Sequence, residues 1–144
     1  NDLDFDKSQV VISCGGKHAF YNLAQVLLNP GDEVIIPAPY WVSYPDMVRL
    51  AGGTPVIVPA TEKNGFKLTP AQFDAALTDK TKLVVINSPS NPTGAGYSKD
   101  ELSAIAEIIL RYPNAWVVSD EIYEKIIYDN FRFTSIANCG GEIL

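Results

Sequence analysis

The sequence predicts an α/β fold with three layers, in which helices cover both faces of a mainly parallel sheet. Short runs rich in Val and Ile alternate with helical patterns almost from the first residue, as they do in βαβ units. Two of these runs, at residues 83–86 and 115–118, are continuously apolar, which is typical of strands buried on both faces. A chain of 144 residues is long enough for one domain with a sizeable core.

Five strands are expected, each a short apolar run bounded by turn residues. They lie at residues 10–13, 33–37, 54–58, 82–87 and 116–119. Trp116 falls inside the fifth run and is expected to belong to the core. Residues 122–133 fit neither a helix nor a strand clearly, and residues 139–141 are typical of a loop.

Helices are expected between the strands. They lie at residues 16–28, 41–51, 69 to about 77, and from 98 onward. Thr69 with Gln72, and Ser98 with Glu101, are spaced as capping boxes and predict where the third and fourth helices begin. His18, in the second turn of the first helix, is expected to be structural or solvent-facing.

Composition argues against several classes of function. The net charge is −6 and the eleven basic residues are scattered, whereas a nucleic-acid surface needs clustered Lys and Arg. No apolar stretch approaches the ~20 residues that span a bilayer. Cys14 and Cys139 fit neither a metal site nor a disulfide scaffold, and a single histidine disfavours a His-based zinc site. We therefore expect a protein of the reduced cytoplasm with no nucleic-acid or membrane partner.

The segment Ser-Cys-Gly-Gly-Lys at residues 13–17 joins an expected strand to an expected helix. The first N–H groups of a helix lack internal partners and the helix dipole favours an anion there, while glycine lets a phosphate approach the backbone. The alternative is that the two glycines only make a tight turn. No G-x-G-x-x-G pattern is present, so a dinucleotide site is not supported.

Polar residues follow the last two expected strands, where the carboxyl ends of parallel strands form a ligand-binding crevice. Asn91 lies in a proline-rich loop, whose rigidity suits an amide that holds a ligand oxygen. Asp120 is expected at the rim of the sheet, where a carboxylate is costly unless it is paired. Tyr123 follows three residues later. The alternatives are an ordinary turn, a capping acid and a half-buried tyrosine.

Trp41 lies in an aromatic segment after the second expected strand. A flat indole at the carboxyl edge of a sheet can cover the face of a ring ligand, although packing of Trp41 into the core is an equal alternative. An anion cradle, an indole, an amide, an acid and a phenol together suit a phosphorylated, nitrogen-containing ring cofactor.

These segments, in order and spacing, resemble the fold-type I pyridoxal phosphate enzymes, and among them the class I and II aminotransferases of the aspartate aminotransferase group. The residues that carry the resemblance are Gly-Gly-Lys at 15–17, Tyr-Trp-Val-Ser-Tyr-Pro at 40–45, Asn-Ser-Pro-Ser-Asn-Pro-Thr-Gly at 87–94 and Ser-Asp-Glu-Ile-Tyr at 119–123. The likeness covers nearly the whole chain. It implies that the cofactor is pyridoxal 5'-phosphate.

The resemblance also implies a role for each candidate residue. Asp120 is expected to pair with the protonated pyridine nitrogen, and the backbone N–H groups of Gly16 and Lys17 are expected to bind the phosphate. Trp41 is expected to stack on the ring and to line the substrate site. Tyr123 and Asn91 are expected to hydrogen-bond the phenolic oxygen of the ring, with Asn91 also contacting the substrate carboxylate.

The family likeness further implies that residues 1–144 are the central part of the large cofactor-binding domain of a homodimeric enzyme. The Schiff-base lysine is expected beyond Leu144, because Lys125 is too close to Asp120 in sequence. The segment alone is therefore expected to be inactive. The parent enzyme is expected to transfer the amino group of an amino acid, with aspartate as the leading candidate, to 2-oxoglutarate.

Two other interpretations remain open at this point. Within the same fold, the parent is alternatively an aromatic or prephenate aminotransferase or a C–S lyase. From a different class, the chain is a non-catalytic α/β module that binds a nucleotide or a protein partner.

Overall fold

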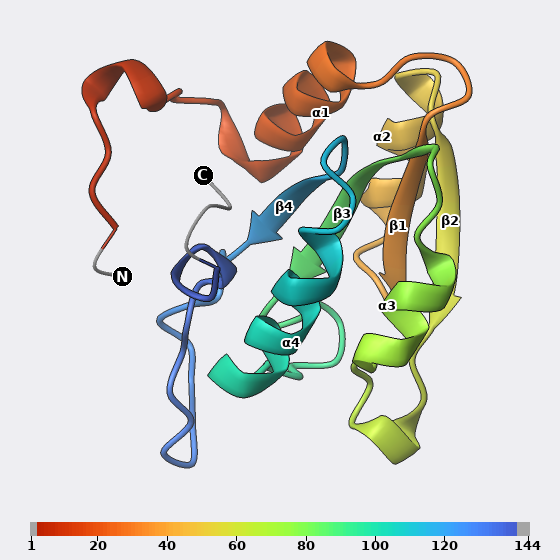
Figure 1. The fold of residues 1–144 in the computed structure, drawn as a ribbon. Helices are drawn as coiled ribbons and strands as arrows, with labels where there is room; N and C mark the ends of the chain where they lie inside the picture. Colours follow the sequence, from red (N-terminus) through yellow and green to blue (C-terminus); the bar gives the residue numbers. More distant parts are fainter. Residues whose placement is uncertain (1–2, 141–144) are drawn as a thin grey trace.

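A computed structural model describes residues 3–140 of the chain, and within them a four-stranded sheet is the central layer (Figure 1). Its strands are β1 (Glu33–Ala38), β2 (Thr54–Pro59), β3 (Thr81–Asn87) and β4 (Trp116–Asp120). All neighbouring strands are parallel and their order is β2-β1-β3-β4. The predicted α/β class with a parallel sheet is therefore confirmed.

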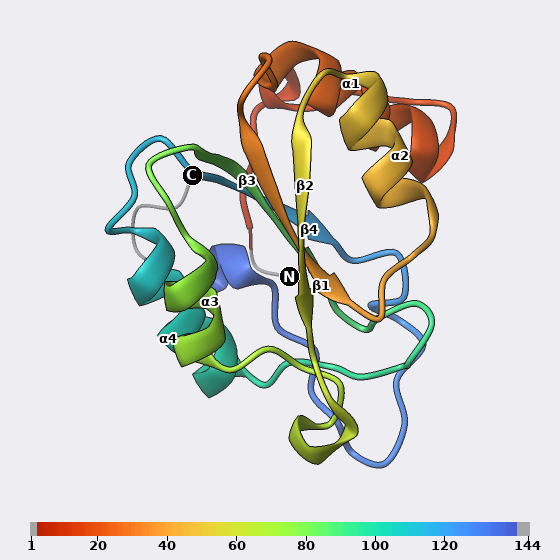
Figure 2. The same ribbon diagram turned by 90° about the vertical axis from the view of Figure 1, so that its right-hand side faces the viewer.

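The α-helices of the described residues cover both faces of this sheet. They are α1 (Gly15–Leu27), α2 (Ser43–Leu50), α3 (Pro70–Ala76) and α4 (Lys99–Ile109). Helices α1 and α2 lie on one side, and α3 and α4 lie on the other, as Figure 2 shows. Short 3₁₀ helices occur at η1 (Lys7–Gln9), η2 (Glu62–Asn64) and η3 (Ile136–Asn138). None of the helices in residues 3–140 has the length and apolar character needed to cross a bilayer.

The strand order explains why the helices divide between the two faces. The chain leaves β1 through α2 to reach β2, then returns over β1 through α3 to reach β3. Crossover connections between parallel strands are right-handed. A connection that moves one way across the sheet therefore lies on one face, and a connection that moves the other way lies on the opposite face. The direction changes between β1 and β3, and in open α/β sheets ligands bind outside the carboxyl ends of the strands at such a point.

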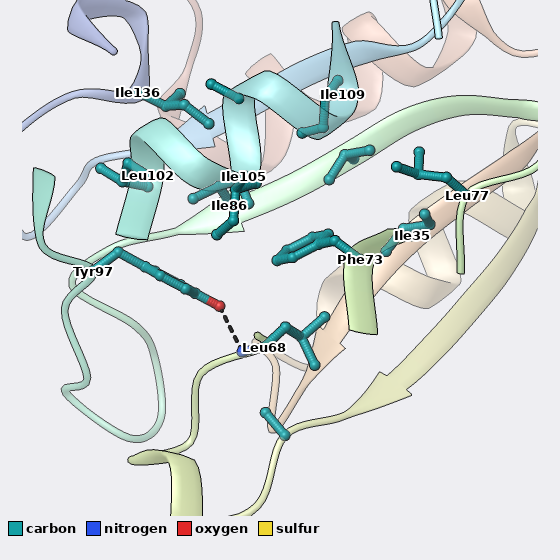
Figure 3. Packing of buried hydrophobic residues seen from close by; sticks show 13 residues of the cluster. Ile35, Leu68, Phe73, Leu77, Ile86, Tyr97, Leu102, Ile105, Ile109 and Ile136 are labelled. Carbon is teal, nitrogen blue, oxygen red and sulfur yellow. Dashed lines mark hydrogen bonds between the residues drawn. The ribbon is translucent and has the colours of Figure 1, made fainter. Parts of the chain in front are cut away.

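Alternation along the strands divides the core into two clusters. Val34 and Ile36 face α1 and α2, whereas Ile35 between them faces α3 and α4, because successive side chains of a strand point to opposite faces. All three are fully buried. Figure 3 shows the cluster on the α3 and α4 side, where Phe73 and Ile105 pack against the sheet.

The two predicted capping boxes are confirmed. The Thr69 side chain accepts a hydrogen bond from the N–H of Gln72, and the Gln72 side chain accepts one from the N–H of Thr69 at 3.0 Å. Ser98 and Glu101 make the same reciprocal pair at the start of α4. In each box, two backbone N–H groups at the start of the helix therefore have hydrogen-bond acceptors.

Two expectations about the sheet are wrong. Residues 10–13 form no strand in the described structure, and the side chains of Val11 and Ile12 are 84% and 95% exposed. A β-branched run favours extended backbone, but a strand also needs a neighbour that accepts its hydrogen bonds. Trp116 begins β4 as expected but is 56% exposed, because β4 is the last strand in the order and no described element covers this ring.

The remaining differences are small. The expected helix at 41–51 begins two residues later, at Ser43. Residues 122–133, which fit neither pattern, contain turns without a helix or a strand. Of the expected loop at 139–141, Cys139 and Gly140 form a bend and Gly141 lies outside the described residues.

Candidate functional site

An open pocket of about 900 Å³ lies against the carboxyl ends of β3 and β4, between the start of α1 and the β1–α2 loop. All of the residues that the sequence predicted for the cofactor line this pocket: Gly16, Lys17, Trp41, Asn91, Asp120 and Tyr123. Residues separated by more than a hundred positions therefore border one space. The described residues contain no cluster of side chains that could hold a metal ion.

The start of α1 leaves two backbone donors for a ligand. Four N–H groups at a helix start have no intrahelical acceptor. In α1 the N–H of Cys14 donates to Nδ1 of His18 at 3.0 Å, and the N–H of Gly15 donates to the carbonyl of Ser13 at 2.9 Å. Among the described contacts, the N–H groups of Gly16 and Lys17 have no acceptor. His18 is exposed and structural, as expected.

The two glycines keep these donors accessible. Gly15 has a φ of +81°, a conformation that L side chains rarely adopt. A Cβ atom placed on either Gly15 or Gly16 would meet no protein atom within 4 Å, so the backbone there faces open space. An anion can therefore approach the positive end of α1 closely.

Both carboxylate oxygens of Asp120 are held at the end of β4. Oδ2 accepts a hydrogen bond from the hydroxyl of Tyr44 at 2.5 Å, and Oδ1 accepts one from the N–H of Ile122 at 3.3 Å. Tyr44 is 1% exposed. Its burial and its hydrogen bond to Asp120 raise the pKa of Tyr44 above its ordinary value, so the hydroxyl remains a proton donor.

Trp41 packs against the core, which was one of the two expected alternatives, and it also lines the pocket. Its ring meets that of Tyr44 at 83°, with the centroids 5.3 Å apart. Nζ of Lys17 lies 5.3 Å from the Trp41 ring centroid, which is within the range of a cation–π contact. The edge contact fixes the plane of the indole at the pocket wall.

The loop after β3 is tied to the end of β4 through Asn87. Nδ2 of Asn87 donates to the carbonyl of Asp120 at 3.0 Å, and Oδ1 accepts the N–H of Asn91 at 2.7 Å. Within the loop, the N–H of Gly94 donates to the carbonyl of Ser90 at 2.8 Å. These bonds restrain the loop and hold Asn91 at the pocket.

The segment that carries Tyr123 is anchored by Glu121. The Glu121 carboxylate accepts hydrogen bonds from the hydroxyls of Ser119, at 2.7 Å, and Ser135, at 2.6 Å. The carbonyl of Tyr123 accepts the N–H of Ile126 at 2.8 Å, which closes a turn. This turn keeps Tyr123 beside the carboxyl end of β4.

Sequence reasoning gave no role to Tyr44 and Asn87, although both belong to the segments it singled out. Tyr44 follows Trp41 by three residues in the turn that enters α2, where its N–H donates to the Trp41 carbonyl at 3.1 Å. Asn87 is the first polar residue after a buried run, at the position where polar side chains reach the crevice. These two spacings are signals that could have identified them.

The chain belongs to the class I and II aminotransferase family, whose model matches residues 1–143. It is 56% identical over 137 residues to the aspartate/prephenate aminotransferase of Cereibacter sphaeroides, covering 95% of this chain and 34% of that protein. It is 52% identical to the aspartate aminotransferase of Bacillus sp., covering 99% of this chain and 36% of that protein. The chain thus spans about a third of the length of these curated relatives.

Solved structures of aminotransferases share the fold of this chain. The aspartate aminotransferase from Rhizobium meliloti superposes with a TM-score of 0.95 at 41% identity, covering 97% of this chain and 35% of that one. The aromatic aminotransferase from Pyrococcus horikoshii superposes with a TM-score of 0.83 at 44% identity, covering 87% and 33%. The sheet and its helices therefore have the arrangement found in part of an aminotransferase.

Proposed function

We propose that residues 1–144 are the central part of the large, cofactor-binding domain of an aminotransferase that uses pyridoxal 5'-phosphate. The observation that carries this proposal is the pocket itself, which is lined by all six residues expected to hold the cofactor. Membership of the aminotransferase family supports the same assignment.

The chemistry of the pocket fits this cofactor. Its phosphate matches the accessible N–H groups of Gly16 and Lys17 at the positive end of α1. Its pyridine nitrogen matches the carboxylate of Asp120, and its flat ring matches the indole of Trp41. When bound, pyridoxal phosphate supplies an electron sink that stabilises the negative charge left on a substrate carbon after proton removal.

The residues of the chain act by binding, orienting and fixing charge. The carboxylate of Asp120 would favour a protonated ring nitrogen, the form in which the ring withdraws electrons best. Trp41 covers one ring face and borders the substrate. Asn91 and Tyr123 donate hydrogen bonds to the ring oxygen, and Asn91 also contacts the substrate carboxylate.

The lysine that links covalently to the cofactor is proposed to lie beyond Leu144. Lys17 is the lysine that lines the pocket among the described residues, and its ammonium group is directed over Trp41. Lys125 is exposed and does not line the pocket. We therefore propose that the segment alone binds the cofactor weakly and carries out no transamination.

Aspartate is proposed as the amino donor and 2-oxoglutarate as the acceptor of the whole enzyme. The names of the relatives from Cereibacter and Bacillus both include aspartate, which supports this choice. A second candidate acceptor is prephenate, because the name of the relative at 56% identity includes it. We further propose that the whole enzyme is a cytoplasmic homodimer that serves amino acid biosynthesis, as the family likeness implies.

The proposal is tested by titrating the full-length protein that contains this chain with 4'-deoxypyridoxine 5'-phosphate. This analogue lacks the aldehyde, so its binding reports the non-covalent contacts alone. Asp120→Ala and Trp41→Ala should each weaken binding by about 10-fold or more, because each removes a side chain expected to contact the cofactor ring.

Trp116→Ala is the matched control, since Trp116 lies outside the pocket lining. It should bind the analogue as the unmodified protein does. If neither Asp120→Ala nor Trp41→Ala alters binding, the site assignment is wrong. If the unmodified protein does not bind the analogue, the proposed cofactor site is wrong.

A further inference from the structure

Tyr44 of α2 contacts three of the elements that surround the pocket. Its hydroxyl donates to Oδ2 of Asp120 at the end of β4. Its ring makes an edge contact with Trp41 of the β1–α2 loop and a tilted contact with Phe20 of α1, at a centroid distance of 5.0 Å. One buried side chain therefore joins the carboxylate, the indole and the helix whose start faces the pocket.

We propose that Tyr44 is a positioning residue that holds the Asp120 carboxylate in the orientation required by the pyridine nitrogen of the cofactor. The proposal rests on the proposed function, in which Asp120 contacts that nitrogen. It adds a residue to which neither the sequence motifs nor the family likeness assigned a role.

The hydrogen bond from Tyr44 restricts the carboxylate strongly. The hydroxyl oxygen of Tyr44 in α2 lies 2.5 Å from Oδ2 of Asp120 at the end of β4, so the bond ties the carboxylate to a neighbouring helix. The N–H of Ile122 holds the other oxygen, so rotation of the carboxylate would break two hydrogen bonds at once. Tyr44 is also 1% exposed, so packed neighbours hold its side chain in place.

The ring of Tyr44 links this carboxylate to the wall against which the cofactor ring is expected to lie. Because the rings of Tyr44 and Trp41 pack at 83° with their centroids 5.3 Å apart, a shift of Tyr44 would move the indole as well as the carboxylate. Phe20 packs against the ring of Tyr44 and is 6% exposed, which limits such a shift. The relative position of the two cofactor contacts is therefore set by the packing of one tyrosine.

The test uses the full-length protein and the same aldehyde-free analogue. Tyr44→Phe keeps the ring and removes only the hydroxyl, so the contacts with Phe20 and Trp41 remain. We expect analogue binding to weaken by about 10-fold. Tyr97→Phe is the matched control: Tyr97 is 5% exposed and its hydroxyl accepts the N–H of Leu68 on the opposite side of the sheet, so its loss should leave binding unchanged.

A second pair of variants separates positioning from a general structural role. In an Asp120→Asn background, Tyr44→Phe should weaken binding by less than about 2-fold, because the carboxylate through which Tyr44 acts is gone. Equal weakening in both backgrounds would overturn the proposal. No effect of Tyr44→Phe beside a clear effect of Asp120→Asn would also overturn it. An Asp120→Asn variant that binds normally would instead contradict the proposed function.

A spectroscopic measurement covers the case in which Tyr44→Phe does not fold. Incorporation of 3-fluorotyrosine at position 44 keeps the side chain nearly the same size and makes its hydroxyl a stronger donor. The ¹⁵N resonance of the ring nitrogen in the bound, labelled analogue should then move, while 3-fluorotyrosine at position 97 should not move it. An unchanged resonance with the fluorinated residue at 44 would overturn the proposal.

Discussion

The side chain of Asn87 joins the loop after β3 to Asp120 at the end of β4, because its Nδ2 donates to the Asp120 carbonyl at 3.0 Å. Its Oδ1 accepts the N–H of Asn91 at 2.7 Å. One amide thus uses both of its ends to hold two residues of the pocket. The backbone positions of Asn91 and Asp120 are consequently fixed relative to one another before any ligand binds.

Asn87→Asp should destabilise the protein by about 1–3 kcal/mol, because it replaces a donor with an acceptor opposite the Asp120 carbonyl. Urea unfolding of the full-length protein measures this change. Asn114→Asp, at an exposed turn, makes the same chemical substitution without a buried partner and should change stability by less than about 0.5 kcal/mol. Equal effects of the two substitutions would contradict the role given to Asn87.

Gly16→Ala should separate stability from binding. The added methyl group meets no protein atom, and alanine in a helix is favoured over glycine by roughly 0.5–1 kcal/mol, so the free energy of unfolding should rise or stay unchanged. Binding of inorganic phosphate and of the aldehyde-free analogue should nevertheless weaken by about 10-fold, because the methyl group occupies the approach to the backbone donors.

Gly15→Ala gives the opposite result for stability. The positive φ of Gly15 costs an L residue about 1–2 kcal/mol, so this variant should unfold more easily. If Gly16→Ala leaves the binding of phosphate and analogue unchanged, the start of α1 is not the phosphate site.

Gly96→Ala should disturb the contact between two loops near the site. A Cβ on Gly96 would lie 2.6 Å from Cζ of Phe131, too close for either atom to remain in place. We expect a loss of about 1–3 kcal/mol in the free energy of unfolding. The double variant Gly96→Ala/Phe131→Ala should recover part of that loss relative to the sum of the single changes. Strict additivity would show that the two residues do not meet.

Stability should fall in acid partly through Glu101. Burial opposes ionisation of this side chain, but hydrogen bonds from Lys67 and Ser98 outweigh it and place the pKa of Glu101 below its ordinary value of 4.5. A depressed folded-state pKa contributes stability that is fully present above the unfolded-state pKa and is lost as pH falls through the folded-state pKa.

Glu101→Gln isolates this contribution, because Gln at the same position preserves the capping box with Ser98 but cannot pair with Lys67 as an ion. Between about pH 6 and about pH 3, the unfolding free energy of the variant should depend less steeply on pH than that of the unmodified protein. If the unfolding free energies of the variant and of the unmodified protein change with pH at the same slope, Glu101 does not contribute to stability in acid.

Most of the fold could be predicted because the local signals, such as capping residues and apolar spacing, agree with the burial that the fold imposes. Helix α4 starts at a capping box, and its apolar side chains repeat at helical spacing, so the sequence alone gives its start closely. Strand β3 is equally clear, since a continuous apolar run suits a strand buried on both faces. Asn87 ends β3, and Ser98 caps the start of α4.

The errors arose where structure depends on a partner that a local pattern does not reveal. Residues 10–13 have strand composition, but in the described structure no neighbour pairs with them. The burial of Trp116 depends on what covers the last strand, which periodicity does not report. Tyr44 was missed because its importance comes from Asp120, which lies 76 residues away in the sequence.

The central claim is that the helix start, the indole and the carboxylate of this pocket hold a single pyridoxal phosphate molecule. A crystal structure of the full-length protein with bound pyridoxal 5'-phosphate tests it directly. The account predicts the phosphate on the N–H groups of Gly16 and Lys17 and the ring nitrogen about 3 Å from the Asp120 carboxylate. A cofactor whose phosphate lies away from α1, or whose ring nitrogen does not meet Asp120, would contradict it.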